Sequence, residues 1–296
     1  MRLTGLAPAK VNLFLHVGPV APDGYHPLCS LVAFADIGDI VTVEPSDHLS
    51  LAVTGPFGSV LSAGGQGDNL ILKALRALGD AAAIGEPGLR VVLDKRLPIA
   101  AGLGGGSSDA GTALMLANQL LGLGLDQTAL EGVSRVVGAD GPMCLRARTA
   151  WAEGYGERLT DAPDLPLLHA VLVNPGVPSP TGAVYRAYDA APRTADRPSS
   201  PPGWETSAVI DWLAGCRNDL EAPAVGLAPG IETALRAVAG CPDVRLTRMS
   251  GSGATVFGLF DDEGSARAAA STLTRRHDGW WIAPCVLGSN LASISK

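Results

Sequence analysis

A glycine-rich segment in the first half of the chain has the residues of an anion-binding loop. Residues 98–108 read PIAAGLGGGSS, and four of the five residues from Gly102 to Gly106 are glycine. Because glycine has no Cβ, successive backbone N–H groups can converge on an anion, and the helix that follows adds its positive end. The hydroxyls of Ser107 and Ser108 supply further donors or a ligand for Mg²⁺. A flexible turn is the alternative, but such turns rarely lie between a buried strand and an amphipathic helix.

This loop matches neither of two common phosphate-binding patterns. A Walker A loop has lysine after its last glycine, whereas Ser107 follows Gly106 here. A dinucleotide-binding fingerprint starting at Gly102 requires glycine or alanine at position 107. A second glycine motif, GSG at 251–253, is followed by an apolar strand rather than a helix. It is interpreted as a tight turn, which either closes over a nucleotide or belongs to a purely structural hairpin.

Lys10 and Asp140 are the candidate cation and base for chemistry at such a loop. Only four lysines occur against eighteen arginines, so position 10 is a candidate site for a compact ammonium, with a solvated surface lysine as the alternative. Asp140 precedes Gly141 and Pro142 and is either a capping or turn residue or a general base that Lys10 holds ionised. Phosphoryl transfer needs mainly positioning and charge neutralisation. Spacing alone does not bring positions 10 and 140 together.

Composition and charge exclude several classes of protein. The 296 residues are 47% hydrophobic and 17% charged, which excludes a disordered chain and suffices for one large domain or two ordinary ones. A net charge of −7 argues against a nucleic-acid binder. Five cysteines without a CxxC pair indicate a reduced, cytoplasmic protein without a zinc site. The longest apolar stretch, 110–125, is interrupted by polar residues and glycines, so no membrane span is expected.

Hydrophobic periodicity predicts strands and helices in an α+β arrangement. We expect strands at 10–17, 39–44, 49–53, 89–93, 167–173, 244–249, 254–260 and 280–286. We expect helices at 107–121, 126–138, 228–239 and 263–276, and another that Asp68 caps. In the first strand, alternation places Lys10 and Asn12 on the same face. Residues 191–203, with four prolines, are predicted to form a mobile surface loop.

Five segments together resemble the GHMP kinase superfamily. They are APAKVNLFLHV (7–17), PDGYHPL (22–28), PIAAGLGGGSSDAG (98–111), GADGPMCL (138–145) and MSGSGATVFG (249–258). Their order is the expected one, so the resemblance covers almost the whole chain. The glycine loop and the MSGSGAT segment mark the superfamily. The DGYH segment with KVNLFLHV points to the member that acts on a cytidyl diphosphate of methylerythritol.

The resemblance implies an α+β fold of two domains with both substrates in the cleft between them. The N-terminal domain, placed at residues 1–155, is expected to resemble ribosomal protein S5 domain 2, and the C-terminal domain, 156–296, to be ferredoxin-like. The implied reaction is phosphorylation of the 2-hydroxyl of the erythritol moiety, with ATP as co-substrate and Mg²⁺, in isoprenoid precursor synthesis. The expected partner is this small molecule alone, bound to a monomer or weak homodimer, with no nucleic acid and no membrane.

The resemblance also assigns roles to residues of the catalytic and ATP sites. Lys10 and Asp140 match the family's catalytic positions. The segment that matches its ATP-phosphate loop consists of Pro98, Ile99, Ala100, Ala101, Gly102, Leu103, Gly104, Gly105, Gly106, Ser107 and Ser108.

Five further residues match positions that hold the cytidyl diphosphate substrate. Asn12, Tyr25 and His26 belong to the first two motifs, and Thr181 and Tyr185 to the stretch PSPTGAVY. Thr181 matches a polar contact and Tyr185 an aromatic residue that stacks on cytosine. A base between Tyr25 and Tyr185 is a reasonable use of two aromatic rings. His26 is expected to read the polar edge of the pyrimidine, whereas without the resemblance a solvated surface histidine is the simpler interpretation.

Three residues depart from the family pattern or fit it loosely. The family usually has a β-branched residue after the catalytic aspartate and often phenylalanine after the following proline, where this chain has Gly141 and Met143. Gly141 is expected to loosen the turn that aims Asp140, without abolishing activity. The carboxylate of Asp109 would repel phosphate unless it points away or helps to hold Mg²⁺.

Two other functions remain open at this point. One is another GHMP kinase that acts on a different small alcohol, against which the DGYH segment argues. The other is a non-catalytic nucleotide-binding sensor on the same fold. The presence of both Lys10 and Asp140 argues against a sensor, because a sensor needs no base.

Overall fold

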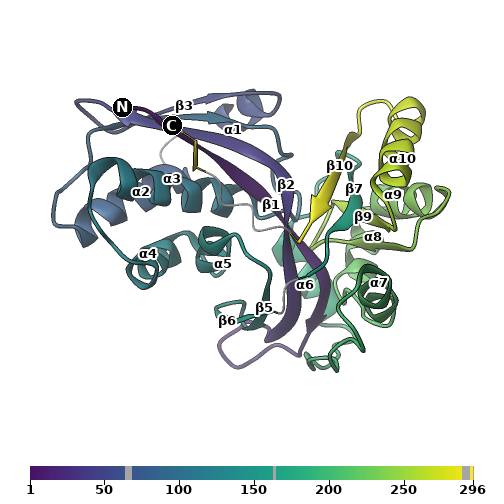
Figure 1. The fold of residues 1–296 in the computed structure, drawn as a ribbon. Coiled ribbons are helices and arrows are strands. Elements are labelled where there is room, and N and C mark those ends of the chain that lie inside the picture. Colours follow the sequence, from purple (N-terminus) through teal and green to yellow (C-terminus); the bar gives the residue numbers. More distant parts are fainter. Residues whose placement is uncertain (64–68, 163–164, 289–293, 296) are drawn as a thin grey trace.

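The computed structural model describes residues 1–63, 69–162, 165–288 and 294–295, and two long strands dominate it (Figure 1). β1 (Leu3–Val17) and β2 (Leu28–Pro45) pair antiparallel along most of their length. Both are longer than the sequence predicts. Residues 7–17 of β1 are all buried, so this part of the strand shows little of the alternation that marks a half-buried strand. The missed first half of β2 is likewise a nearly continuous buried run.

An N-terminal lobe is built around these strands. The strands that join them are β3 (Ser50–Thr54), β4 (Leu89–Asp94), β5 (Ala150–Gly154), β6 (Arg158–Asp161) and β11 (Ile294–Ser295). The helices are α1 (Gly58–Ala63), α2 (Leu70–Ala81), α3 (Gly105–Leu121), α4 (Gln127–Ser134), the 3₁₀ turn η1 (Arg135–Val137) and α5 (Gly141–Arg146). α2 and α3 bury their apolar faces with β2 and β4 in one hydrophobic cluster.

The N-termini of three helices can be compared with the predicted N-cap residues and starting positions. The side chain of Asn69 accepts a hydrogen bond from the N–H of Ile71 at 2.9 Å and caps α2, while the predicted cap, Asp68, lies outside the described residues. The predicted cap Asp126 is confirmed, because its carboxylate accepts from the N–H of Ala129 at 2.8 Å. α3 begins at Gly105, two residues before the expected start, so the last glycines of the loop belong to the helix.

The C-terminal lobe confirms the expected ferredoxin-like arrangement. Its strands are β7 (Leu168–Asn174), β8 (Leu246–Met249), β9 (Val256–Phe260) and β10 (Trp281–Leu287). Its helices are α6 (Thr181–Tyr188), α7 (Thr206–Ala214), α8 (Glu221–Leu227), α9 (Gly230–Ala239) and α10 (Glu263–Arg276). The antiparallel strand order β10-β7-β9-β8, with α9 and α10 packed on the sheet, is that of a βαββαβ unit.

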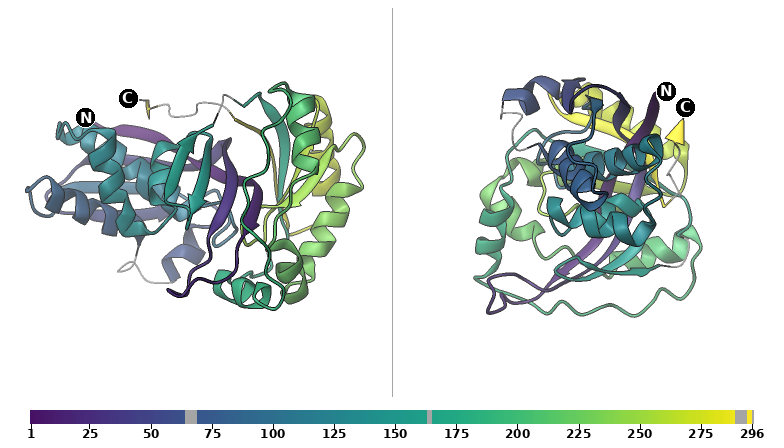
Figure 2. Two further views of the ribbon diagram at one scale, coloured as in Figure 1. Left: turned by 90° about the horizontal axis from the view of Figure 1, so that it is seen from below. Right: turned by 90° about the vertical axis from the view of Figure 1, so that its left-hand side faces the viewer.

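A shared core fixes the two lobes relative to each other. Along β7, Leu168, Ala170 and Leu172 belong to a central cluster that also contains Val11 and Leu13 of β1. The alternate β7 residues face the α9 and α10 side instead, which is why β7 is apolar over most of its length. Seen from below, the purple strands lie between the blue and teal helices and the green and yellow ones (Figure 2).

Residues 191–203 contain no helix or strand, as predicted for a surface loop, but they are pinned to both lobes. A ring nitrogen of His16 on β1 lies 2.7 Å from the carbonyl oxygen of Asp196. The guanidinium of Arg197 lies 4.0 Å from the ring centroid of Trp151 on β5. The indole N–H of Trp212 donates to the carbonyl of Ser199 in the same loop at 2.7 Å. These contacts oppose the free movement that the composition predicts.

Two further observations bear on the predicted class of protein. Among the helices in the described part of the chain, none is long and apolar enough to cross a lipid bilayer. The five cysteines, all within the described ranges, are buried and free.

We expect His16 to make the stability of the fold depend on pH. Burial lowers the pKa of His16 below its ordinary value of 6.5. The unfolded chain therefore takes up a proton near pH 6.5 while the folded chain does not, and the free energy of unfolding falls as the pH drops below that value. Urea titrations of wild type and His16→Gln should show their stability difference shrinking from about pH 7.5 to about pH 5.5. The exposed His48→Gln is the control, and a His16→Gln difference that does not change with pH would contradict this account.

Candidate active site

A cavity of about 520 Å³ lies between the glycine loop, β1, the start of α5 and the turn before β9. Most of the predicted site residues line it: Lys10, Asn12, Pro98, Ile99, Ala100, Ala101, Gly102, Gly104, Gly105, Gly106, Ser107, Asp140, Thr181 and Tyr185. Four do not: Tyr25, His26, Leu103 and Ser108. The structure thus brings together residues from both lobes that are up to 175 positions apart, from Lys10 to Tyr185.

Two glycines of the loop are required by backbone geometry. Gly102 has φ +75° and Gly104 has φ +62°, a region that favours glycine. A Cβ on Gly102 would lie 2.5 Å from the carbonyl oxygen of Ser250, and one on Gly104 would lie 3.1 Å from the Cβ of Lys10. No side chain caps α3 at its N-cap, Gly104. Residues 104–107 line the cavity, so the uncapped N–H groups at the start of α3 are available there to bind an anion.

Leu103 and Ser108 fasten the loop to β1 and do not face the cavity. The side chain of Leu103 lies in the central core, and its carbonyl accepts from the N–H of Lys10 at 2.8 Å. The hydroxyl of Ser108 is fully buried and donates to the carbonyl of Pro8 at 2.7 Å. The expectation that both serines offer donors to a ligand is therefore corrected, because only Ser107 has its side chain at the cavity.

The SGSG segment is both a hairpin turn and part of the cavity wall. It connects β8 to β9, and Gly251 and Ser252 line the cavity. The hydroxyl of Ser250 donates to the carbonyl of Gly102 at 3.0 Å and accepts from the N–H of Asn12 at 3.1 Å. The two alternatives for this motif are thus compatible, since the hairpin itself joins the glycine loop to β1.

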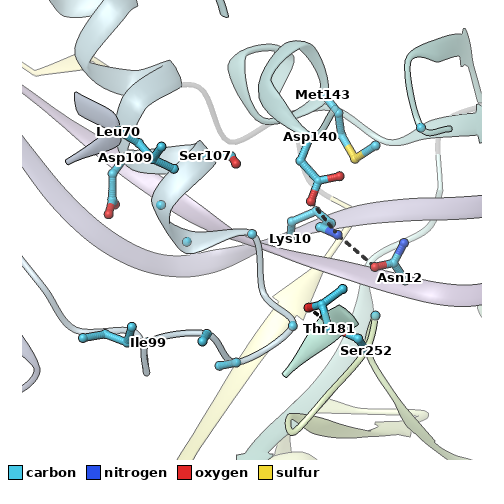
Figure 3. Close-up of a pocket in the computed structure, with 18 of the residues that line it drawn as sticks. Lys10, Asn12, Leu70, Ile99, Ser107, Asp109, Asp140, Met143, Thr181 and Ser252 are labelled. Atoms are coloured by element: carbon cyan, nitrogen blue, oxygen red, sulfur yellow. Dashed lines mark hydrogen bonds and ion pairs between the residues drawn. The ribbon is translucent and has the colours of Figure 1, made fainter. Parts of the chain in front are cut away.

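Lys10 and Asp140 meet in this cavity (Figure 3). The Nζ of Lys10 lies 3.3 Å from Oδ2 of Asp140 and donates to Oδ1 of Asn12 at 2.9 Å. The Lys10 side chain is 8% exposed, whereas that of Asp140 is 42% exposed. The amide of Asn12 is itself held, because its Nδ2 donates to the hydroxyl of Ser30 at 2.8 Å. The ammonium is therefore held in place by Asn12, while the more exposed carboxylate of Asp140 is accessible to a ligand.

Asp140 is aimed by a helix that the sequence did not predict. It occupies the N-cap position of α5, yet its side chain makes no capping hydrogen bond, which excludes the simple capping interpretation. The following Gly141 is tightly packed, since a Cβ there would lie 2.1 Å from the carbonyl oxygen of Ser134. The expectation that Gly141 loosens this turn is therefore wrong. Its missing side chain lets α5 approach the end of α4.

Lys95, Asp39 and Asp109 form a second ion cluster, which the sequence analysis did not predict. The Nζ of Lys95 donates to Oδ2 of Asp39 and to Oδ2 of Asp109, both at 2.6 Å, and all three side chains are buried. Oδ1 of Asp39 accepts from the N–H groups of Arg96 and Leu97 at 2.6 and 2.8 Å. The cluster ties the end of β4 to β2 and α3, and so sets where the glycine loop begins.

The contact with Lys95 determines the direction in which the Asp109 side chain points. The carboxylate lies on the Lys95 side of α3 and not toward Lys10 (Figure 3). Burial raises the pKa of Asp109 well above its ordinary value, although the ammonium of Lys95 opposes that shift. Burial by itself lowers the pKa of Lys95, but the Asp109 and Asp39 carboxylates outweigh it and raise that pKa. The sequence did offer one indication of this cluster, because Lys95, one of only four lysines, follows the predicted buried strand at 89–93.

Two of the predicted substrate residues, Thr181 and Tyr185, line the cavity from α6. Tyr185 is on α6, and its ring centroid lies 4.9 Å from that of His26. Burial raises the pKa of Tyr185 to about 12. Nε2 of His26 lies 2.6 Å from Oδ1 of Asp189, which orients the imidazole. The hydroxyl of Thr181 is 2.8 Å from that of Ser252, so α6 is joined to the hairpin turn.

Tyr25 lies at the rim of the cavity and is not one of its lining residues. It is 65% exposed, and its aromatic neighbour is Tyr155 at 5.7 Å between ring centroids, not Tyr185. Tyr155 lines the cavity and was not among the predicted residues. A base held between Tyr25 and Tyr185 therefore remains a prediction, with Tyr155 as an additional ring on the Tyr25 side.

The donor set fits a metal ion that arrives with a nucleotide better than a resident one. In the part of the chain that the structure describes, no three His, Cys, Asp or Glu side chains gather to hold a metal. The oxygen donors that line the cavity include the hydroxyl of Ser107 and the carboxylates of Asp140 and Asp109, and Oδ1 of Asp109 is buried without a hydrogen-bond partner. Mg²⁺ is commonly held by one or two protein oxygens together with substrate phosphates and water.

Comparisons with known proteins show the family of the chain. Two family models match the chain, GHMP kinases N terminal domain over residues 69–147 and GHMP kinases C terminal over residues 209–278. A 4-diphosphocytidyl-2-C-methyl-D-erythritol kinase of Caulobacter vibrioides (strain NA1000 / CB15N) is 51% identical, over 97% of this chain and 100% of its own. A relative of the same name from Methylobacterium radiotolerans is 50% identical, over 96% and 99%.

Solved structures support the same assignment. A crystal structure of 4-(cytidine 5'-diphospho)-2C-methyl-D-erythritol kinase has a TM-score of 0.77 at 37% identity and covers 97% of this chain and 99% of its own. Homoserine kinase from Cytophaga hutchinsonii, at 18% identity and TM-score 0.68 over 99% and 97%, shares the fold. The chain belongs to the GHMP kinase family, whose members use ATP as co-substrate. Within it, relatives at about half identity over nearly the whole chain are 4-diphosphocytidyl-2-C-methyl-D-erythritol kinases.

We expect Gly102→Ala to damage ATP binding far more than it damages the fold. The new Cβ would lie 2.5 Å from the carbonyl of Ser250 and force the loop away from the hairpin turn. Gly85→Ala is the matched control, because Gly85 also has a positive φ, +71°, but nothing lies within 4 Å of its Cβ position. Both variants should lose about 1–2 kcal/mol of stability from the left-handed conformation. Calorimetric titration with ATP should show at least a tenfold weaker affinity for Gly102→Ala only, and equal affinities for both would contradict the role of the loop.

Proposed function

We propose that this chain transfers the γ-phosphoryl group of ATP to the 2-hydroxyl of 4-diphosphocytidyl-2-C-methyl-D-erythritol, in the synthesis of isoprenoid precursors. The observation that carries the proposal is the contact of Lys10 with Asp140 beside uncapped N–H groups of α3, in a chain half identical to kinases of that name. A kinase for another small alcohol and a non-catalytic sensor are not favoured, because relatives named 4-diphosphocytidyl-2-C-methyl-D-erythritol kinase match nearly the whole chain.

In the proposed reaction Asp140 is the general base and Lys10 the fixed cation. The 2-hydroxyl oxygen attacks the γ-phosphorus, its proton passes to the Asp140 carboxylate, and the bond from the γ-phosphorus to the bridging oxygen breaks with its electrons on ADP. The positive charge of Lys10 holds the carboxylate in place and offsets negative charge that collects at the transferred group. Asn12 keeps that ammonium from moving toward the phosphates in the ground state.

The two substrates are proposed to occupy opposite ends of the cavity. The N–H groups from Gly104 to Ser107 receive the β- and γ-phosphates of ATP. Tyr185 and Tyr25 enclose the cytosine, and His26, oriented by Asp189, reads its polar edge.

Several broader expectations accompany this proposal. Mg²⁺ bound together with ATP would be held by phosphate oxygens and the hydroxyl of Ser107, and it would neutralise phosphate charge. The chain is divided functionally into 1–155, which carries the ATP loop and the catalytic pair, and 156–296, although β6 and β11 of the second segment pair with strands of the N-terminal lobe. The protein works in the cytoplasm as a monomer or weak homodimer, without nucleic acid.

Asp140→Asn tests the base directly. The amide keeps the shape of the side chain but cannot take the proton of the hydroxyl, so turnover should fall by about 10²–10⁴. ADP release with saturating ATP and acceptor is the measurement. A rate within a few-fold of wild type would remove Asp140 from the role of base.

Lys10→Ala separates the cation from the phosphate loop. We expect kcat to fall by about a hundredfold or more, while the dissociation constant of ATP changes less than tenfold, because backbone N–H groups hold the triphosphate. Lys73→Ala, at an exposed position of α2, is the control for loss of a lysine charge. If Lys10→Ala lost ATP binding in proportion to turnover, the ammonium would be a nucleotide ligand in the ground state.

A further inference from the structure

The turn between β1 and β2 and the tip of the β5–β6 hairpin lie side by side at the rim of the cavity. The pairing of β2 with β5 places Leu28 opposite Gly154, so the 19–27 turn ends where the hairpin tip begins. Tyr155 and Gly156 at that tip line the cavity. The hairpin tip is held in shape by its own contacts, since the N–H of Tyr155 donates to the carboxylate of Glu157 at 2.6 Å.

Tyr155 joins the two segments through both parts of its side chain. Its hydroxyl donates to Oδ2 of Asp23 at 2.6 Å, across 132 positions of sequence. Oδ1 of the same carboxylate accepts from the N–H of Tyr25 at 3.0 Å. The rings of Tyr155 and Tyr25 lie 5.7 Å apart at 49°, within the range of a favourable aromatic pair. Asp23 thus links the hydroxyl of one tyrosine to the backbone of the other.

The backbone of the 19–27 turn is closed by its own hydrogen bonds, among them one from the N–H of Ala21 to the carbonyl of Tyr25 at 2.7 Å, but the Tyr25 ring projects from it. Tyr25 is 65% exposed, and a Cβ at the neighbouring Gly24 would meet nothing within 4 Å. The hydrogen bond from Tyr155 is the main cause that lowers the pKa of Asp23. The ionised carboxylate accepts both hydrogen bonds, and bonds to a charged acceptor are the stronger kind. The hydrogen bond and the ring contact of Tyr155 restrict its side chain, which costs conformational entropy. A role in positioning Tyr25 would account for that cost.

We propose that Tyr155 is a positioning and specificity residue for the nucleoside-diphosphate acceptor: through Asp23 it holds the 19–27 turn over the cavity, and with Tyr25 it forms one aromatic wall against which the pyrimidine stacks. This inference rests on the proposed function and adds a residue to it. The side-chain contacts of Tyr155 are with Asp23 and Tyr25 and not with the glycine loop, so the effect is expected on the acceptor rather than on ATP. The acceptor's base, rather than its erythritol moiety, is the part that Tyr155 recognises.

The test is a comparison of steady-state kinetics for Tyr155→Phe, Tyr155→Ala and Asp23→Ala, with ATP and acceptor varied separately. Tyr155→Ala removes both the ring and the hydroxyl. It should raise the acceptor KM about tenfold or more, in line with the binding free energy gained when a base stacks on an aromatic ring. Tyr155→Phe keeps the ring and should raise it only a few-fold. The KM for ATP and kcat at saturation should stay within about twofold of wild type in both variants, a split that mere loss of stability would not produce.

A double variant shows whether the hydroxyl acts through Asp23. Tyr155→Phe combined with Asp23→Ala should raise the acceptor KM no further than Asp23→Ala alone. Calorimetry with cytidine 5'-diphosphate should reproduce the tenfold loss for Tyr155→Ala. If wild type phosphorylates the acceptor but Tyr155→Ala keeps the wild-type acceptor KM, this inference is overturned and the proposed function stands. If wild type does not phosphorylate the acceptor at all, the proposed function fails and the inference falls with it.

Discussion

A lysine ammonium held inside the protein is the interaction on which the rest of the site depends. The Lys10 side chain is 8% exposed, and a buried charge is tolerated only when it is paired and hydrogen-bonded. Asn12 supplies a neutral oxygen and Asp140 the opposite charge. Glycine is favoured at position 104 because its φ is +62° and its Cβ would lie only 3.1 Å from the stem of Lys10. The loop, β1 and α5 are therefore arranged around one positive charge.

The surrounding fold makes that arrangement rigid. β1 carries Lys10 and lies in the core that both lobes share, so the cation cannot move without disturbing both. The hairpin turn before β9 is bonded to the glycine loop through Ser250, and the buried Lys95 cluster fixes the start of that loop from the other side. Transferring a phosphoryl group depends chiefly on such positioning.

Local patterns predicted much of this structure, and long-range contacts account for what they missed. The period of two in β1 correctly placed Lys10 and Asn12 on one face, and the glycine loop before a helix was recognised from composition. The meeting of Lys10 with Asp140 is a contact across 130 positions, which spacing did not predict and which stayed a hypothesis until the resemblance to a family supported it. Tyr155 lies at a hairpin tip that no periodicity marks, and the short α5 begins with Gly-Pro, which is typical of a turn.

The most direct test of the central claim is a double-mutant cycle on Lys10 and Asp140, measured as single-turnover phosphoryl transfer. If the two side chains act as one unit, Lys10→Ala combined with Asp140→Asn will be about as slow as the slower single variant, because the second change removes nothing further. If instead the two losses multiply, the ammonium and the carboxylate work independently, and an account built on their contact is contradicted.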